Sequence, residues 1–395
     1  MKPPLPCVLS FNAGSSSIRF AVHEAGTFLQ RLEGKIDRIG RSGGTFVVRD
    51  ADGTRTVRAL SLSDPSSGLL PWLEAQAIFG SIKGAGHRVV HGLKHAVPAR
   101  VTPRLLAELH RLIPLDPEHL PRELGLIEAV AARHPGLPQV ACFDTAFHRP
   151  MPPVARRLAI PRQYAARGVE RYGFHGLSYA YLMEELGRID PAALNGCVIL
   201  AHLGNGASLA AVHRGRSLDT SMGFTPAAGL MMGTRSGDLD PGLLSFLARR
   251  DGMTPAGFDR MVNHESGLLG VSGRSSDIRD LLAREDRDPR AAEAVELFCY
   301  QAKKWIGAYT AVLGGLDTVI FSAGIGQNAP VIRERICSGL GYLGLKLDVR
   351  RNRRNAAVIS AAGSRVCVRV IRTDEELMIA RSVVRMLHLP RRQRR

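Results

Sequence analysis

Three short turns of small residues in this sequence could each hold a phosphate group. They are 14–17 (GSSS), 204–208 (GNGAS) and 323–328 (AGIGQN). Small residues let the backbone approach an anion closely and point its N–H groups at it. The third turn follows a strand-like run and precedes a helix expected from Pro330, an order typical of nucleotide sites. None of the three matches the P-loop or the dinucleotide-binding pattern, which excludes both of those classes.

Charged and imidazole side chains follow several apolar runs. In α/β proteins the ligand-binding and catalytic residues usually lie at such strand ends. These candidates are Arg88, Asp144, His175, His202, Arg235, Asp277 and Arg279. Each has a simpler explanation when taken alone, because an aspartate often caps a helix and a histidine often bonds locally. The HRVVH segment spaces two histidines four residues apart but lacks the glutamate of metalloproteases, so zinc is not favoured.

An internal repeat indicates how these residues are positioned. Residues 8–23 (VLSFNAGSSSIRFAVH) align with residues 198–213 (VILAHLGNGASLAAVH) without a gap, at an offset of 190. Each copy is an apolar run, a turn of small residues and a second strand-like run, which is typical of a β-hairpin. Two copies half a chain apart predict two similar α/β domains facing a common cleft. The alternative, a chance likeness, is disfavoured because the turns match as well as the strands.

The spacing of apolar residues in the rest of the chain predicts a mixed α/β fold. Strands are expected at 139–143, 318–322 and 366–371, and helices at 104–113, 125–133, 177–186, 291–313 and 375–387. Thr373-Asp374-Glu375 would cap the last helix, which we expect to return to the first domain.

Length and composition limit the possible classes of protein. A chain of 395 residues with 45% hydrophobic residues suggests two globular domains, and no apolar run is long enough for a transmembrane helix. The first residues do not resemble a signal peptide. Six scattered cysteines without zinc spacing fit a reducing compartment. We therefore expect a cytoplasmic protein that does not contact membranes.

The formal net charge of +17 would attract nucleic acid or a small anionic substrate. Arginine supplies most of this charge, and no aromatic residues are interleaved with it, so we expect no nucleic-acid partner. The clusters at 350–354 (RRNRR) and 391–395 (RRQRR) are interpreted as solvated loops or termini. Salt-sensitive retention on DNA would support the nucleic-acid alternative.

Segments spread from about Val8 to Arg381 resemble the acetate kinase family in order and spacing. They are FNAGSSSIRF, HRVVHG, FDTAFH, RYGFHGLS, HLGNGAS, DTSMGFTPAAGLMMGTRSGDLDP, SGLLGVSGRSSDIRDL, AGIGQNAPVIRE and TDEELMIAR. The resemblance implies an α/β fold of duplicated RNase H-like domains of the sugar kinase/Hsp70/actin superfamily, with a central cleft. It also implies reversible transfer of phosphate from ATP to acetate, giving acetyl phosphate and ADP, in a homodimer that uses Mg²⁺ or alternatively Mn²⁺.

The expected domains follow from the same resemblance. Residues 1–148 would form an acyl-binding domain on which the helix 376–390 packs. Residues 149–375 would form a nucleotide-binding and dimerisation domain, and 391–395 a basic tail.

The resemblance also assigns catalytic roles. Arg88 and Arg235 would hold the carboxylate and the transferring phosphoryl group. His175 would stabilise the transition state, and His202 would bond the phosphoryl group. Asp144 would orient the arginines or the metal-bound ligand. A carboxylate acceptor is already ionised at neutral pH and needs no general base, so the task is to bring two anions together.

Three further groups of residues match the family's binding positions. The metal positions are Asn12 and Glu375. The nucleotide positions are Arg19, His202, Leu203, Gly204, Asn205, Gly206, Asp277, Ile278, Arg279, Gly324, Ile325, Gly326, Gln327 and Asn328. The acyl pocket comprises Arg88, Val90, Leu115, Phe174 and Pro226. Such a pocket separates acids that differ by one methylene by only ~1–3 kcal/mol, so a preference for acetate over propionate is weakly specified.

Several positions depart from the family's pattern. Arg19 replaces a lysine, Gln327 replaces an acid, and Leu177 and Tyr179 alter the motif around His175. The loop Leu115–Leu120 also differs. These departures concern substrate range and nucleotide preference. They leave two alternatives, a propionate or broader short-chain acyl kinase and a weakly active ATP-binding sensor of the same fold, although a sensor has no need of transition-state groups.

Overall fold

The computed structural model describes residues 5–14, 17–37, 44–50, 52–59 and 65–390. Contacts between residues divide the chain into two compact units. Unit 1 comprises Met1–Ala146 and Asp374–Arg395, and unit 2 comprises Phe147–Thr373. Part of the turn at 14–17 and the whole tail at 391–395 lie outside the described residues.

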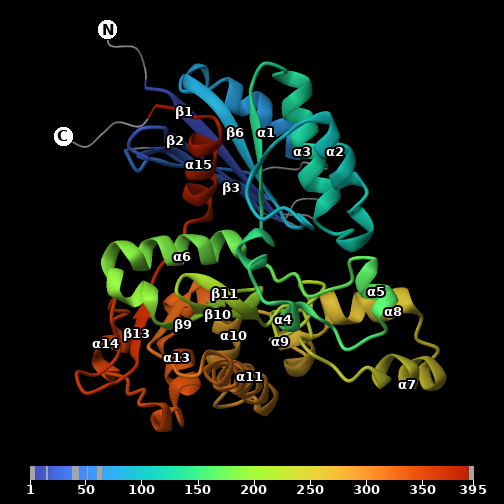
Figure 1. Cartoon of the computed structure of the whole chain (residues 1–395), viewed down its shortest axis with the longest axis vertical. Helices are drawn as coiled ribbons and strands as arrows, with labels where there is room; N and C mark the ends of the chain where they lie inside the picture. Colours follow the sequence, from blue (N-terminus) through green and yellow to red (C-terminus); the bar gives the residue numbers. More distant parts are fainter. Residues whose placement is uncertain (1–4, 15–16, 38–43, 51, 60–64, 391–395) are drawn as a thin grey trace. The chain divides into compact units, whose positions relative to one another are not determined.

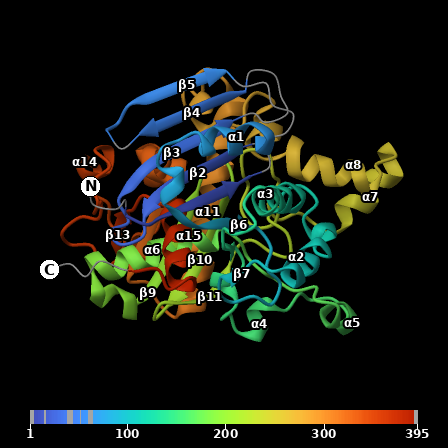
Figure 2. The ribbon, with the colours of Figure 1, turned by 90° about the horizontal axis from the view of Figure 1, so that it is seen from above.

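A single sheet forms the centre of unit 1. Its strands are β1 (Cys7–Ala13), β2 (Ser17–Glu24), β3 (Gln30–Asp37), β4 (Thr45–Asp50), β5 (Arg55–Ala59), β6 (Ile82–Val89), β7 (Ala99–Arg100) and β8 (Gln139–Phe143). Their order in the sheet is β5-β4-β3-β2-β1-β6-β8-β7. β1 to β5 pair antiparallel, whereas β6 runs parallel to both β1 and β8. Figure 2 shows β5, β4, β3 and β2 following one another across the sheet.

Helices cover both faces of this sheet. They are α1 (Pro65–Glu74), α2 (Pro103–His110), α3 (Leu120–Arg133) and α15 (Glu375–Met386), with short 3₁₀ turns at Phe79–Ser81 and Ile113–Leu115. α1 and α3 contribute to a core with the odd-numbered residues of β1. α15 packs against β1, β2, β6 and β8, although it lies at the other end of the sequence (Figure 1). Two glycines of β6 permit this contact, since a Cβ on Gly84 or Gly86 would lie 2.4 Å from side chains of the C-terminal segment.

Unit 2 is built on a smaller sheet. Its strands are β9 (Cys197–Leu203), β10 (Ala207–His213), β11 (Arg216–Thr220), β12 (Thr318–Ser322) and β13 (Cys367–Val370), in the order β11-β10-β9-β12-β13. The helices are α4 (Pro153–Arg156), α5 (Arg162–Ala166), α6 (Gly176–Ile189), α7 (Gly242–Asp251), α8 (Pro255–Arg260), α9 (Gly267–Ser272), α10 (Ile278–Leu282), α11 (Pro289–Leu313), α12 (Ala323–Asn328), α13 (Pro330–Cys337) and α14 (Val349–Arg353).

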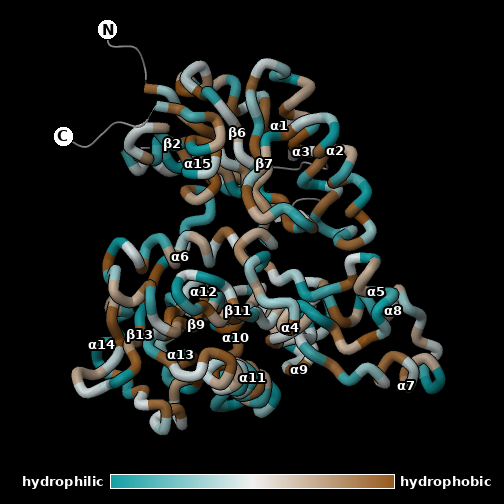
Figure 3. The backbone as a smooth tube through the Cα atoms, in the orientation of Figure 1, coloured by the Kyte–Doolittle hydropathy of each residue, from teal (hydrophilic) through white to brown (hydrophobic). Residues whose placement is uncertain are grey.

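The longest of these helices, α11, packs on β10 with one apolar face. Its buried residues recur at helical spacing, and Asp288 caps its start while Gly314 ends it with a φ of +69°. Figure 3 accordingly shows hydrophilic and hydrophobic residues mixed along α11. In the described part of the chain, no helix is long and apolar enough to cross a membrane.

The internal repeat is confirmed, and both copies are β-hairpins. β3-β2-β1-β6-β8 in unit 1 corresponds strand for strand to β11-β10-β9-β12-β13 in unit 2. The pairing registers differ by one residue, however. Val8 pairs with His23, whereas Val198 pairs with Val212 rather than with His213. The ungapped alignment of the two copies therefore hides a difference in their turns.

Most predicted elements are observed, and three predictions need correction. The cluster at 350–354 lies mostly in the helix α14 rather than in a loop, and its Asn352 is buried. The strands at 139–143 and 318–322 and the capped last helix are confirmed, with the Asp374 carboxylate accepting the Leu377 N–H at 2.8 Å. The helix expected from 125 begins at Leu120, because Pro121 can occupy the first turn of a helix. The segment 323–328 is a short helix rather than an open turn, entered through Ala323 at a φ of +61°.

Candidate functional site

The ends of β6 and β8 bring Arg88 and Asp144 into direct contact in unit 1. Arg88 Nε donates to Asp144 Oδ2 at 2.8 Å, and Nη2 lies 2.6 Å from the same oxygen. The arginine side chain is 13% exposed and the aspartate 1%. Burial alone would lower the pKa of Arg88, but the carboxylates of Asp144, Glu123 and Glu375 raise it above its usual value. Arg88 is therefore a fixed, largely buried cation whose Nε and Nη2 edge faces Asp144.

The other edge of the Arg88 guanidinium is held by unit 1 itself. Nη1 donates to the Ala13 carbonyl at 2.9 Å and lies 3.4 Å from Glu123 Oε1. Glu123 Oε2 in turn accepts the N–H of Val90 at 2.8 Å. Sequence reasoning missed Glu123, since an acidic residue in the first turn of a helix usually only complements the helix dipole.

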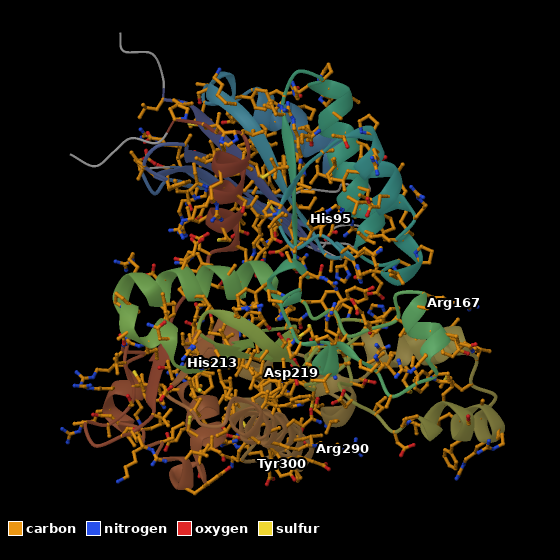
Figure 4. All side chains as sticks on the ribbon, in the orientation of Figure 1. His95, Arg167, His213, Asp219, Arg290 and Tyr300 are labelled. Atoms are coloured by element: carbon orange, nitrogen blue, oxygen red, sulfur yellow. The ribbon has the colours of Figure 1, made fainter. Side chains whose placement is uncertain are left out.

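Asp144 is fixed by the packing of the residue before it. His95, labelled in Figure 4, stacks on Phe143 with ring centroids 4.8 Å apart. Gly92 also packs on this ring, because a Cβ there would lie 2.5 Å from Phe143 Cγ. The Gly92 N–H donates to Thr145 Oγ1 at 3.1 Å. These contacts hold the segment on both sides of Asp144.

Asn12 and Glu375, the expected metal positions, lie together in unit 1. The Asn12 amide donates to Glu375 Oε2 at 2.8 Å and to Glu376 Oε1 at 3.1 Å. Burial and the neighbouring Glu375 raise the pKa of Glu376, and Arg19, which pairs with Asn12 across the hairpin, lowers it. Oxygen ligands beside a surplus of negative charge fit Mg²⁺, which usually completes its shell with phosphates and water. Among the described residues no group of three or more His, Cys, Asp or Glu could hold a metal ion.

His175 is held in a defined orientation in unit 2. It precedes α6 with a φ of +61°, and its Nδ1 lies 2.8 Å from Ser208 Oγ on β10. Its Nε2 side faces the turn after β9, since a Cβ on Gly206 would lie 3.3 Å from Nε2. A serine beside a histidine could suggest a nucleophile and its base, but the Ser208 side chain is fully buried. Ser208 therefore orients His175.

His202 stacks on His175, with ring centroids 4.0 Å apart. Its Nδ1 lies 2.8 Å from Ser178 Oγ, and that hydroxyl also contacts Thr373 Oγ1 at 2.8 Å. Its Nε2 would lie 3.9 Å from a Cβ built on Gly204. Both histidines thus bond a serine at Nδ1 and present Nε2 near the Gly204–Gly206 turn.

Tyr179, a departure from the family's pattern, lies behind this pair. Its side chain is fully buried, and its hydroxyl hydrogen-bonds to Ser208 Oγ. Burial raises the pKa of Tyr179 well above its usual value, so the hydroxyl keeps its proton. Tyr179, Ser208 and His175 form one hydrogen-bonded chain.

Arg235 approaches the same turn from a tightly folded loop. A Cβ on Gly206 would lie 3.7 Å from Arg235 Nη1. The loop closes on itself where Met232 N–H donates to the Arg235 carbonyl at 3.0 Å. Gly267 packs directly on this loop, because a Cβ there would lie 2.2 Å from the Met232 carbonyl oxygen. The close contact leaves little room for the loop to shift.

Arg19 lies on β2 of unit 1, and the other expected nucleotide residues fall into three segments of unit 2. Leu203 is buried at the end of β9, and the exposed Asn205 fixes the turn by accepting the Gly233 N–H at its carbonyl at 3.0 Å. Asp277 caps α10 and pairs with the exposed Arg279, while Ile278 is buried. The third segment is α12, which contains Gly324, Ile325, Gly326, Gln327 and Asn328.

α12 is stabilised by Arg333, which sequence reasoning did not single out, and by two of its own side chains. The fully buried Arg333 donates to the carbonyls of Gly326 and Gln327 at 2.8 and 2.9 Å. The Gln327 amide oxygen, oriented by its partners, accepts the N–H groups of Ala323 and Thr373 at 3.2 and 3.3 Å. Asn328 donates to the Gly324 carbonyl at 2.9 Å. Gln327 therefore has a structural role in which it needs no negative charge.

The expected acyl-pocket residues are divided between the units. Val90 is buried after β6, and Leu115 is half-buried at the end of the 3₁₀ turn in unit 1. Phe174 is buried in unit 2, where its carbonyl bonds His148 Nε2 at 3.0 Å, and Pro226 is half-buried. The altered loop after Leu115 contains a buried pair, in which Asp116 Oδ1 lies 2.8 Å from His119 Nδ1.

The two sets of side chains suit chemistry on oxyanions. Unit 1 offers a fixed guanidinium and a group of carboxylates, and unit 2 offers two imidazoles and a guanidinium beside a glycine turn. Arginine binds carboxylate and phosphate oxygens in a planar fork, and pre-oriented donors stabilise charge that develops on a moving phosphoryl group. Each set by itself therefore suits the binding of carboxylate or phosphate groups.

Comparison with known proteins gives a consistent result. The model described as the acetokinase family matches residues 7–381. An acetate kinase from Rhodopseudomonas palustris is 45% identical over 391 residues, covering 96% of this chain and 98% of that protein. A propionate kinase from Citrobacter rodentium is 44% identical, covering 96% of each chain.

Solved structures agree with the sequence matches. The crystal structure of Porphyromonas gingivalis acetate kinase superposes with a TM-score of 0.88 at 36% identity, covering 97% of this chain and all of that chain. A propionate kinase from Francisella tularensis gives a TM-score of 0.91 at 35% identity, covering 96% of this chain and all of that chain.

Proposed function

The chain belongs to the acetokinase family, and we propose that it catalyses reversible phosphoryl transfer from ATP to acetate, forming acetyl phosphate and ADP. The observation that carries this proposal is the orientation of the polar side chains within each unit. Arg88 is fixed by Asp144 at the strand ends of unit 1, and His175, His202 and Arg235 surround the Gly204–Gly206 turn of unit 2. A protein that only sensed ATP would not need these oriented side chains.

The proposed reaction is a direct in-line displacement. A carboxylate oxygen of acetate forms a bond to the γ-phosphorus as the bond to the bridging oxygen of ADP breaks, and ADP keeps that electron pair. Acetate needs no general base, so the residues act by positioning and charge stabilisation. We assign Arg88 to the acetate carboxylate, with Asp144 as its orienting partner. Arg235, His175 and His202 would neutralise the transferring phosphoryl group.

A divalent cation, Mg²⁺ or alternatively Mn²⁺, would be held by Asn12 and Glu375, with Glu376 as an additional oxygen donor. Such an ion neutralises phosphate charge when it is bound with the nucleotide. The chain's own contribution is the hydrogen-bonded group of Asn12, Glu375 and Glu376, with Arg19 nearby. The nucleotide itself would bind at the three segments of unit 2 described above, including α12.

The nature of the acyl group is the part of the proposal with a serious alternative. Relatives of nearly equal identity are named acetate kinase and propionate kinase. Val90, Leu115, Phe174 and Pro226 are apolar, and an apolar pocket discriminates one methylene only weakly. Acetate remains our first choice, with propionate or a broader range of short-chain acids second.

We further propose that the enzyme works in the cytoplasm as a homodimer, without membrane or nucleic-acid partners. Six free cysteines support a reducing compartment. Sedimentation analysis of the purified protein would test the dimer, because a monomer at micromolar concentration would contradict it.

The deciding experiment measures acyl phosphate trapped with hydroxylamine, using Mg-ATP and a panel of acetate, propionate and butyrate. A preference for acetate supports the first choice, and a preference for propionate or butyrate keeps the mechanism and changes the substrate. A folded protein that binds ATP but forms no product with any acid would favour the sensor alternative. When the variant Arg235→Ala is measured in the same assay, Arg249→Ala on the exposed surface of α7 is a suitable control for the loss of one positive charge.

A further inference from the structure

Glu123 is a buried acid for which the proposed reaction has no assigned use. It lies in the first turn of α3, and its side chain is only 1% exposed. Glutamate is almost never fully buried unless it is paired, and leaving such a group without partners is costly. Its contacts therefore indicate what it does.

Both carboxyl oxygens of Glu123 contact residues assigned to the acyl pocket. Oε2 accepts the Val90 N–H at 2.8 Å, and Oε1 lies 3.4 Å from Arg88 Nη1. One side chain from α3 thus fixes the backbone at Val90 and one edge of the Arg88 guanidinium. Any displacement of Glu123 would move two parts of the pocket together.

The charges that face Glu123 come from three elements. They are Arg88 from β6, Asp116 from the loop before α3 and Asp144 after β8. Asp144 is the ionised partner of Arg88, because it makes both short contacts with the guanidinium, at 2.8 and 2.6 Å, whereas Glu123 is more distant. A second carboxylate ion beside this pair would leave the cluster with surplus negative charge.

Burial and this surrounding charge favour the neutral acid. Burial and the charges of Asp116 and Asp144 together raise the pKa of Glu123 to about 8, against the opposing effects of Arg88 and the Val90 N–H. At neutral pH Glu123 then adds no negative charge beside the guanidinium, whose short contacts are with Asp144. The guanidinium can attract the carboxylate of a substrate without competition from a second acid.

We propose that Glu123 is a positioning residue for the acyl substrate, holding Arg88 and Val90 as a neutral acid and weakening carboxylate binding when it loses its proton. This inference rests on the proposed function, since it assumes that Arg88 binds a carboxylate. The competing explanation is that Glu123 only satisfies the Val90 N–H. An amide oxygen could do that equally well, and no dependence on pH would result.

The test is the KM for acetate between pH 6 and pH 9 in the wild-type enzyme and in Glu123→Gln. In the wild type we expect this KM to rise about tenfold between pH 7 and pH 9, from repulsion between two nearby carboxylates. The KM for ATP should change much less. In Glu123→Gln the acetate KM should stay flat, so that at pH 9 the variant binds acetate more tightly than the wild type. A variant with the same rise as the wild type would overturn the proposal.

A second variant keeps the proposal testable if Glu123→Gln does not fold. Asp116→Asn removes a neighbouring negative charge, which should ease ionisation of Glu123 and move the rise in KM to lower pH. A merely structural role for Glu123 would not shift this midpoint, and an unshifted midpoint overturns the proposal. A wild-type enzyme that forms no acyl phosphate would overturn the proposed function and this inference together. An active wild type with a flat acetate KM would overturn the inference alone.

Discussion

The imidazole rings of His175 and His202 stack face to face, with centroids 4.0 Å apart and planes inclined by 19°. Each ring is bonded at Nδ1 by a serine, Ser208 or Ser178. The pair therefore presents two oriented Nε2 atoms to the same glycine turn.

Tyr179→Phe tests the hydrogen-bonded chain that orients His175. Losing the hydroxyl frees Ser208 to rotate, so we expect kcat to fall about 3- to 10-fold with little change in the KM for acetate, an effect equivalent to ~1 kcal/mol. Steady-state kinetics at saturating Mg-ATP would measure it. Tyr181→Phe, two residues along α6, is the matched control, and equal effects in both variants would remove Tyr179 from this role.

Arg235→Ala removes the guanidinium beside the Gly204–Gly206 turn. We expect turnover to fall by ~10²–10⁴-fold, the range found when a group that stabilises transition-state charge is lost. The fold should persist, because the side chain is half-buried and polar. Acyl phosphate formation and thermal unfolding should be measured on the same sample, and a loss below threefold would exclude Arg235 from the mechanism.

Gly267→Ala should destabilise unit 2 by more than the cost of placing an alanine in a left-handed backbone conformation. Gly267 has a φ of +64°, and a Cβ there would lie 2.2 Å from the Met232 carbonyl oxygen. Gly252 is a matched control, with a φ of +68° and no atom within 4 Å of the added Cβ. We expect Gly252→Ala to cost ~1 kcal/mol and Gly267→Ala at least ~3 kcal/mol in the free energy of unfolding. Chemical denaturation measures both, and equal costs would contradict the close contact.

The buried His148 ring should lower the free energy of unfolding in acid. Burial lowers its pKa to about 4, against the hydrogen bond to the Phe174 carbonyl, so the folded protein keeps this ring neutral. Below its unfolded pKa of about 6.5 the unfolded chain binds the extra proton, and the free energy of unfolding should fall by about 2 kcal/mol between pH 7.5 and pH 5. Denaturant unfolding of the wild type and of His148→Gln checks this. The variant should have the shallower slope with pH, and parallel slopes would refute the assignment.

The sequence predicted the two hairpins and the strand-end residues well, because residues close together in the sequence specify those features. Small residues between apolar runs specify the turns, and Arg88, Asp144 and His202 follow or end such runs. The repeat predicted two similar α/β domains, and five strands correspond between the two sheets, whereas β4, β5 and β7 have no counterpart in unit 2. The one-residue difference in register could not be read from an alignment without gaps.

The residues that sequence reasoning missed are those whose roles depend on distant partners. Glu123 and Ser208 have ordinary local contexts, and only folding places them against Arg88 and His175. The segment at 323–328 was expected to be an open turn because of its glycines. It is helical because Arg333, buried beneath it, satisfies the carbonyls at its end. Such contacts have no signal in the spacing of nearby residues.

The register difference between the hairpins has a consequence for how the two halves of the molecule diverged. Asn12 and His202 occupy equivalent places in the repeat, yet Asn12 faces Arg19 across its hairpin and His202 faces Ser208. Facing residues share one side of a sheet, so a shift of one residue changes which neighbour each can recruit. Two copies of one hairpin can thus bring different side chains together while keeping the same strands. Anyone who transplants residues between the copies must move the turn as well, because Ser208 placed at position 18 would not face position 12.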